Sequence, residues 1–350
     1  MTLKEELEIL RGEPIQVFEG DPMDVPCIET SDPDKLCKNP VVSVHMITYN
    51  HEPYIRQAIE GVMMQETDFE FELIIGEDCS QDKTREICFK YQKKYPDRIR
   101  VLWWHENVSK LGGNSRRVCA RSRGEFIAFC EGDDYWTDPL KLQKQVDVMR
   151  GNNSVGLVLT YGVILRDCDG YVSDFPCKFS GLVDRKKMLE IVLESFVFGV
   201  ITCACMYRRD VLISNLHRLP LLETMRLRCG DTQCILATLT THAVYFIPEK
   251  MVVYRKISTS ATGTQRANFF VGRDGLLVRY AYTRMTLAGS VCEHLKQMYS
   301  RYMLIYGFSY LPFRHWLSLL ALNTSKSSAV FALFHSRLRS FVKRLILWHR

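Results

Sequence analysis

Short hydrophobic runs alternate with longer amphipathic segments between residues 40 and 161. The runs predict buried strands at 41–48, 71–76, 98–103, 125–130 and 155–161. The segments between them predict helices at 53–65, 82–95, 114–122 and 138–149, the second of which ends before Pro96. Strands and helices that alternate through short connections favour a mostly parallel α/β sheet covered by helices on both faces.

The pattern is weaker on either side of this region. After residue 165 it predicts helices at 184–195, 208–216 and 231–241, one strand at 244–248, and a helical chain after about 260. Before residue 40, acidic residues and four prolines follow a short helix predicted near 3–11. We therefore expect an irregular N-terminal arm at 1–39, an α/β domain at 40–260 and a helical extension at 261–350.

Composition is typical of a soluble globular protein, with 350 residues of which 47% are hydrophobic and 25% charged. No uninterrupted apolar run is long enough to predict a membrane-spanning helix. The first 25 residues are acidic and do not resemble a secretory signal, so we expect a cytoplasmic protein whose 13 cysteines are reduced thiols. Cys203, Cys205, Cys229 and Cys234 fit the spacing of no common zinc site.

The net charge of +6 is concentrated at the C-terminal end, where residues 294–350 contain no Asp or Glu. Near the end of the chain, aromatic and aliphatic residues from Phe331 to Trp348 fall on one face of a predicted helix, and basic residues fall on the other. Such a helix either lies on a membrane surface, as in a peripheral membrane protein, or packs on the rest of the protein. The remainder of the chain is slightly acidic, so nucleic acid is not an expected partner.

Polar clusters follow three of the predicted strands, at residues 48–52, 77–82 and 131–136. The carboxyl ends of parallel strands meet at one edge of a sheet, so these clusters are expected to lie together. Several carboxylates at one edge repel one another unless a cation is present. The sequence has no glycine-rich phosphate-binding loop, so Mg²⁺ or Mn²⁺ bound with a phosphate-bearing substrate is the chemistry that these residues favour.

Three segments resemble motifs of the family 2 glycosyltransferases. Residues 42–50, VSVHMITYN, resemble the opening strand of that family. Residues 74–84, IIGEDCSQDKT, resemble its second-strand motif, and residues 124–136, GEFIAFCEGDDYW, resemble the strand that ends in its DxD motif. The likeness covers about 41–161 and, more weakly, about 195–256. It implies a GT-A fold with a helical C-terminal extension, and inverting transfer of a sugar from a nucleotide-sugar donor, with UDP as the expected nucleotide.

The resemblance also assigns roles to residues. It places the donor nucleotide against Thr48, Tyr49, Asn50, Glu52, Asp78, Ser80 and Asp133. Tyr49 would stack on the base and Asp78 would accept a hydrogen bond from it. Asp133 and Asp134 would divide ribose contact and coordination of the Mn²⁺ or Mg²⁺ ion between them. Glu77 and Glu131 stand where the family usually has Asp.

Inverting transfer needs a base that accepts the proton of the acceptor hydroxyl. The step Gly230-Asp231-Thr232 resembles a family motif, so Asp231 is either this base or only a helix N-cap. At a helix start, Asp231 is expected to have a low pKa. Arg255 and Lys256 resemble a later motif in which a basic pair contacts the diphosphate, although Ile257 replaces the histidine that often follows.

Two other functions remain open on the sequence. A sugar-nucleotide nucleotidyltransferase shares the α/β nucleotide half, but it usually has a glycine-rich basic loop where residues 49–52 read YNHE. A non-catalytic protein that binds a membrane or nucleic acid would use the basic C-terminal end. By analogy, the transferase hypothesis implies a glycan or lipid-linked acceptor, as in surface polysaccharide synthesis.

Overall fold

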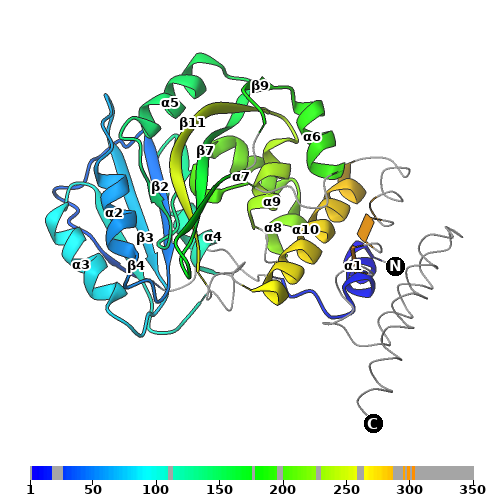
Figure 1. Cartoon of the computed structure of the whole chain (residues 1–350), viewed down its shortest axis with the longest axis horizontal. Helices are drawn as coiled ribbons and strands as arrows, with labels where there is room; N and C mark the ends of the chain where they lie inside the picture. The colour runs from blue at the N-terminus through cyan, green and yellow to red at the C-terminus, as the bar shows by residue number, and fades with distance from the viewer. Residues whose placement is uncertain are drawn as a thin grey trace, which may run out of the picture.

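The computed structural model describes residues 2–17, 27–108, 113–175, 178–194, 200–225, 230–257 and 264–286, together with 295, 298, 299, 302 and 303. One large mixed sheet runs through this part of the chain, with helices packed on both of its faces (Figure 1). The strand order is β1-β4-β3-β2-β5-β10-β7-β11-β6, with β8 paired to β7 and β9 paired to β11. The expected α/β fold class is confirmed.

The first half of the sheet contains four parallel strands, which follow the hydrophobic runs of the sequence. They are β2 (Val42–Thr48), β3 (Phe71–Glu77), β4 (Ile99–Trp103) and β5 (Phe126–Phe129). Strand β2, the first of these four along the chain, lies between β3 and β5, and β4 lies on the far side of β3. This is the order of a nucleotide-binding half of a doubly wound sheet, in which ligands bind beyond the carboxyl ends of the strands.

Helices α2 (Ile55–Met63), α3 (Thr84–Lys94) and α5 (Lys141–Gly151) cover one face of this half. Successive residues of β2 explain why: Val42, Val44 and Met46 join the core beneath these helices, while Ser43 and His45 point to the other face. Helix α4 (Gly113–Ala120) packs on that other face, where Val118 contacts a small core with Ile74. All four helices were predicted, within a few residues at their ends.

The second half contains strands that the hydrophobic pattern did not predict. Strand β10 (Cys205–Arg208) runs antiparallel between β5 and β7 (Val155–Arg166). Four short strands complete the sheet: β1 (Ile28–Thr30), β6 (Tyr135–Trp136), β8 (Tyr171–Asp174) and β9 (Gly181–Val183). Each is four residues or fewer, too short to show a hydrophobic alternation in the sequence.

Strand β11 (Ala243–Lys256) is much longer than the predicted strand at 244–248. The sequence suggests an end at Pro248 because proline cannot donate a ladder hydrogen bond. The strand instead shifts its register against β7 between Ile247 and Lys250 and then continues to Lys256. This irregularity matters for function because the second part of β11 passes directly beside the turn that follows β5.

A second hydrophobic core lies on the opposite face of this half. Its helices are α6 (Arg185–Glu194), α7 (Arg209–His217), α8 (Pro220–Thr224), α9 (Gly230–Thr238) and α10 (Gln265–Thr286), with the 3₁₀ turn η2 (Thr202–Ala204) beside the sheet. The N-terminal helix α1 (Leu3–Arg11) packs on α10, where the hydroxyl of Tyr280 donates to Glu6. No helix of the described residues is long and apolar enough to cross a membrane.

Candidate active site

The loops after β2 and β3 are joined by hydrogen bonds at the carboxyl edge of the sheet. The backbone N–H of Asn50 donates to Ser80 Oγ at 3.0 Å, and Asn50 Oδ1 accepts from the N–H of Gln81 at 2.8 Å. The N–H of Glu52 donates to Asp82 Oδ2 at 3.0 Å, and Glu52 Oε2 accepts from the N–H of Lys83 at 3.1 Å. The structure thus brings together Asn50, Glu52 and Ser80, which sequence reasoning assigned to the nucleotide, and their side chains fix the two loops.

Asp78 lies at the end of β3 and is fully buried. Its Oδ1 accepts from the backbone N–H of Val108 at 2.7 Å, and its backbone N–H donates to the carbonyl of Thr48 at 3.0 Å. Asn107 donates from Nδ2 to the Asp78 carbonyl at 3.1 Å, so the segment after β4 packs on this carboxylate. Tyr49, by contrast, is 41% exposed, which leaves ring surface for stacking.

The carboxylate of Glu77 is hydrogen-bonded to groups of the loop and helix that follow β3. Its carboxylate accepts from Arg85 and from the backbone N–H of Ser80, while the second terminal nitrogen of Arg85 donates to the Trp104 carbonyl at 2.7 Å. This buried glutamate therefore holds the loop after β3 in place, and its extra methylene relative to Asp is used to reach Arg85.

The turn Glu131–Asp134 after β5 lies against the end of β2. A Cβ on Gly132 would lie 2.6 Å from Thr48 Oγ1 and 2.9 Å from His51 Nδ1, two atoms that are themselves 3.2 Å apart and hydrogen-bonded. Only glycine fits at this position without a shift of its neighbours. The close approach places Asp133 beside the loop that carries the predicted nucleotide-binding residues.

Glu131 is the least satisfied carboxylate of the turn. Its Oε2 is buried and accepts no hydrogen bond from the residues that the structure describes. Burial and the negative charges of Asp133 and Asp231 raise the pKa of Glu131 to about 8. Asp231 is therefore close enough to the acidic turn to act on it electrostatically, although it follows Asp134 by 97 positions in the chain.

Asp134 points into the protein. It is 2% exposed, its Oδ1 accepts from the backbone N–H of Arg255 at 2.7 Å, and the thiol of Cys203 lies beside its carboxylate. Burial, together with Asp133 and Glu131, raises the pKa of Asp134 well above its ordinary value. Asp133 is half-buried.

Asp231 lies in the first turn of α9, as predicted, and is half-buried. Its Oδ1 accepts from the backbone N–H of Thr232 at 2.7 Å. The expectation of a low pKa is wrong: burial raises the pKa of Asp231, and the Thr232 hydrogen bonds and the charge of Arg279 on α10 offset only part of that rise. The helix start does not decide the pKa because desolvation of the carboxylate outweighs the local dipole.

Arg255 and Lys256 end β11 beside the acidic turn. Arg255 is buried, and its guanidinium donates to the Asp133 carbonyl at 2.6 Å and to Gln57 Oε1 at 2.6 Å. The carbonyl of Lys256 accepts from the backbone N–H of Asp167 at 3.1 Å. Sequence reasoning missed Tyr54 and Gln57, although they follow the first polar cluster at 48–52 by two and five residues.

No group of three or more His, Cys, Asp or Glu side chains suited to a metal ion occurs among the residues that the structure describes. A Mg²⁺ or Mn²⁺ ion that binds together with a nucleotide needs only one or two protein carboxylates, because phosphate oxygens and water complete its shell. When no cation is bound, a turn that binds one is expected to contain an unsatisfied carboxylate oxygen and a carboxyl group with a raised pKa. Glu131 shows both features among the described residues. The residues fit such an ion.

Several predicted features lie outside the described residues. They are the amphipathic segment at 331–348, Gly112 in the turn before α4, and the residues after Ile257. The division of the chain at residues 39 and 260, and the membrane interpretation of the C-terminal end, therefore remain predictions.

Comparisons with known proteins identify the domain. Residues 43–216 match the model of glycosyl transferase family 2. Two matching structures are those of residues 1–349 of S. aureus TarS, in complex with UDP-GlcNAc and with UDP. They align over 85% of this chain with 20% identity, covering 85% and 84% of the TarS chains at TM-scores of 0.56 and 0.55. The chain is a member of glycosyltransferase family 2 and has a GT-A fold, as the motifs predicted.

Relatives in sequence match shorter stretches. An uncharacterised protein of Mycobacterium tuberculosis (strain H37Rv) is 46% identical over 105 residues, which is 30% of each chain. TuaG of Bacillus subtilis (strain 168), whose name assigns it provisionally as a teichuronic acid biosynthesis glycosyltransferase, is 32% identical over 128 residues, 37% of this chain and 49% of its own. The match thus spans 30% of the length of the mycobacterial protein and 49% of that of TuaG.

Proposed function

We propose that the protein is a metal-dependent inverting glycosyltransferase that moves a sugar from a nucleotide-sugar, with UDP as the nucleotide, to a hydroxyl of a glycan or lipid-linked acceptor. The observation that carries the proposal is the position of Asp231 relative to the acidic turn. Its charge acts on the carboxylate of Glu131, whose buried Oε2 accepts no hydrogen bond from the described residues. The candidate base thus comes from α9, outside the half of the sheet that carries the proposed nucleotide loops.

The transfer step needs one base and one stabilised leaving group. In the proposed step, the acceptor oxygen forms a bond to the anomeric carbon while the bond from that carbon to the diphosphate oxygen breaks. The acceptor proton goes to Asp231, whose raised pKa makes it a better proton acceptor as long as it is ionised. A divalent cation, when bound, supplies charge neutralisation for the departing diphosphate.

Binding of the donor follows from the loops at the sheet edge. We assign Tyr49 to the base by stacking, Asp78 to the polar edge of the base, and Asp133 and Asp134 to the ribose and the cation. Thr48, Asn50, Glu52 and Ser80 hold these loops together through the contacts described above. The TarS complexes support UDP because that protein binds UDP and UDP-GlcNAc on a similar fold.

The proposed acceptor is a glycan or lipid-linked sugar of polysaccharide synthesis. The likeness to TuaG supports a role in polysaccharide biosynthesis. A cytoplasmic enzyme held at a membrane surface through the basic residues after His294 would reach a lipid-linked acceptor, and this arrangement remains a prediction.

A screen of nucleotide sugars for release of free nucleoside diphosphate tests the function. The purified chain is incubated with UDP-, GDP- and CDP-sugars, with Mn²⁺ or with EDTA, in the presence of simple sugar acceptors and of water alone. We expect release from a UDP-sugar that requires Mn²⁺. Absence of release from every donor, under conditions where the protein binds UDP, would contradict the proposal.

A further inference from the structure

Arg255 connects more parts of the site than any other side chain described above. Its backbone N–H donates to Asp134 Oδ1 at 2.7 Å, and one terminal guanidinium nitrogen donates to the Asp133 carbonyl at 2.6 Å. The other terminal nitrogen donates to Gln57 Oε1, also at 2.6 Å. One residue at the end of β11 therefore holds both aspartates of the acidic turn and ties them to helix α2.

The guanidinium is enclosed as well as hydrogen-bonded. Arg255 is 5% exposed, and its guanidinium carbon lies 4.8 Å from the ring centre of Tyr54 and 4.9 Å from that of Tyr135. Among the described residues, no carboxylate forms an ion pair with it. The positive charge is therefore stabilised by two aromatic rings and by neutral oxygen acceptors, in a place where an unsupported charge would be costly.

Tyr54 extends this support to the other side of the site. Its hydroxyl donates to Asp167 Oδ2 at 2.7 Å, and Asp167 belongs to the turn between β7 and β8. Its ring also lies edge-on to His51, with centroids 6.5 Å apart, and His51 packs against Gly132 of the acidic turn. The Arg255 side chain thus lies within a continuous set of contacts that surrounds the turn.

We propose that Arg255 is a positioning residue that fixes the acidic turn for cation binding, and that it does not contact the donor diphosphate. Two of the five guanidinium N–H groups donate to protein oxygens, and the group as a whole is enclosed, with 5% of Arg255 exposed. A diphosphate could reach this guanidinium only if the enclosing Tyr54 and Tyr135 side chains moved, and the turn would then lose the support that orients Asp133 and Asp134. The inference rests on the proposed function, because it explains how the same acidic turn is held.

The test separates the metal-dependent part of donor binding from the rest. UDP affinity is measured by calorimetry in EDTA and in saturating Mn²⁺, and the ratio of the two dissociation constants is the metal gain. Residues that orient metal ligands typically contribute about 10- to 100-fold to metal affinity. Arg255→Lys retains a positive charge but not the forked donors, so we expect the metal gain to fall by about that factor while UDP affinity in EDTA is unchanged.

A direct phosphate contact gives the opposite result. In that case Arg255→Lys would lower UDP affinity in EDTA without lowering uridine affinity, and it would retain the metal gain. This combination would overturn the inference. The matched control is Arg166→Met, an exposed arginine on the neighbouring strand β7, which should leave both affinities unchanged. Gln57→Ala removes an acceptor on an exposed residue and should reduce the metal gain without affecting folding.

Folding and metal dependence are checked on the same preparations. If thermal melting shows that Arg255→Lys is not folded, Gln57→Ala decides, and an unchanged metal gain in that variant overturns the inference. A wild-type protein with no metal gain would contradict the proposed metal dependence itself. A wild-type metal gain that Arg255→Lys retains would contradict only the role of Arg255.

Discussion

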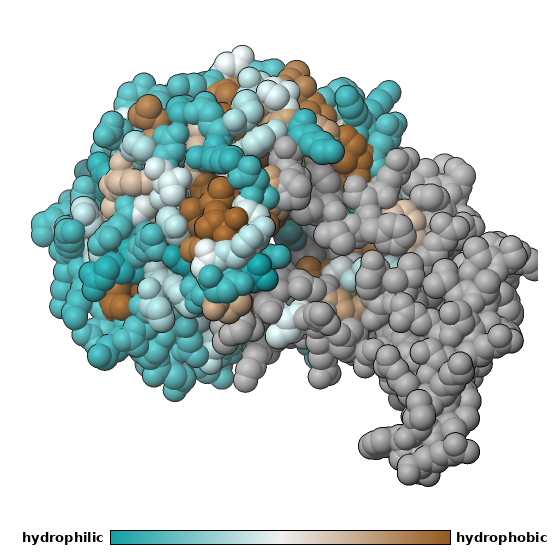
Figure 2. Space-filling view, viewed as in Figure 1, coloured by the Kyte–Doolittle hydropathy of each residue, from teal (hydrophilic) through white to brown (hydrophobic). Residues whose placement is uncertain are grey.

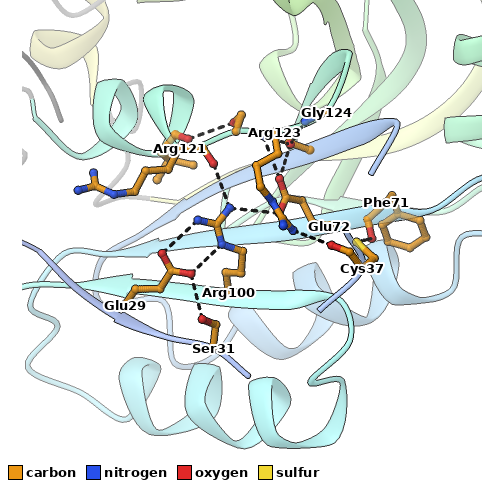
Figure 3. Close-up of polar contacts among 12 residues, drawn as sticks. Glu29, Ser31, Cys37, Phe71, Glu72, Arg100, Arg121, Arg123 and Gly124 are labelled. Carbon is orange, nitrogen blue, oxygen red and sulfur yellow. Dashed lines mark hydrogen bonds and ion pairs between the residues drawn. The ribbon is translucent and has the colours of Figure 1, made fainter. Parts of the chain in front are cut away.

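Glu72 on β3 and Arg100 on β4 form an ion pair of 3.1 Å across neighbouring strands, and the carboxylate of Glu72 is completely buried. The same carboxylate pairs with Arg123 at 2.6 Å and accepts from the hydroxyl of Ser43, while Arg100 also pairs with Glu29 on β1 (Figure 3). Strands β1, β2, β3 and β4 and the segment before β5 are thus joined by one polar cluster.

Removal of Glu72 should destabilise the protein strongly. Glu72→Ala leaves Arg100 and Arg123 without their buried partner, and loss of one member of a buried pair typically costs about 3–5 kcal/mol. Glu29→Ala is the matched control, because the Glu29 side chain is 31% exposed and its loss should cost less. Urea denaturation measures both. Equal small losses for the two variants would show that the cluster contributes little to the free energy of unfolding.

The hydrophobic pattern predicted the nucleotide half because its strands are buried on both faces and its helices are separated by short turns. It failed for β10 because Cys205–Arg208 mixes small, aromatic and charged side chains, so its strand state depends on β5 and β7 on either side. It also shortened β11 at Pro248, where a register shift lets the strand continue. Both errors arise where tertiary pairing overrides local sequence preference.

The roles of the candidate site residues remain predictions. Motif resemblance pointed to the acidic turn and to Asp231, and in the structure the charge of Asp231 acts on Glu131 of that turn. It did not reveal that Arg255 faces the protein, since that depends on the packing of Tyr54 and Tyr135, which lie far from it in the chain. The sequence also predicts a low pKa for Asp231, whereas burial in the folded protein raises it. Burial depends on how the whole chain packs; Figure 2 shows the polar and hydrophobic residues that remain on one face of the folded protein.

Asp231→Asn should separate catalysis from binding. The asparagine retains a side-chain oxygen for the Thr232 N–H, so the melting temperature should hardly change. Donor binding should survive because the nucleotide loops are untouched. Sugar transfer should fall by about 10²–10⁴-fold, the usual contribution of a positioned base. Transfer at a near-normal rate would reduce Asp231 to a helix cap.

Asp78→Asn should alter the choice of base. The variant keeps an oxygen for the Val108 N–H but presents an amide N–H₂ in place of the second carboxylate oxygen. Uracil offers a donor at N3 and cytosine an acceptor there, so UDP affinity should fall by about 10- to 100-fold while CDP affinity rises. Competition binding with UDP, CDP and GDP measures this. An unchanged order of affinities would show that other groups select the base.

His45 should make the protein less stable in mild acid. Burial lowers the pKa of His45 from 6.5 to about 4, so the folded protein holds it neutral while the unfolded chain protonates it below 6.5. The contribution of neutral His45 to the free energy of unfolding is complete above pH 6.5. It is lost as the pH falls toward 4, which lowers that free energy by up to about 3 kcal/mol. His45→Gln should show a shallower fall in the free energy of unfolding over this pH range. Parallel pH curves for the two proteins would contradict the assignment.

Calorimetric titration of UDP into the wild-type protein, Asp133→Asn and Asp134→Asn, each with Mn²⁺ and with EDTA, tests the central claim most directly. The asparagines keep hydrogen-bond acceptors, including the one for the Arg255 N–H, so the fold should be retained. We predict that Mn²⁺ strengthens UDP binding to the wild-type protein and that this effect is lost in at least one variant. UDP binding that is insensitive to Mn²⁺ in all three proteins would contradict a metal-dependent nucleotide-sugar site at the acidic turn.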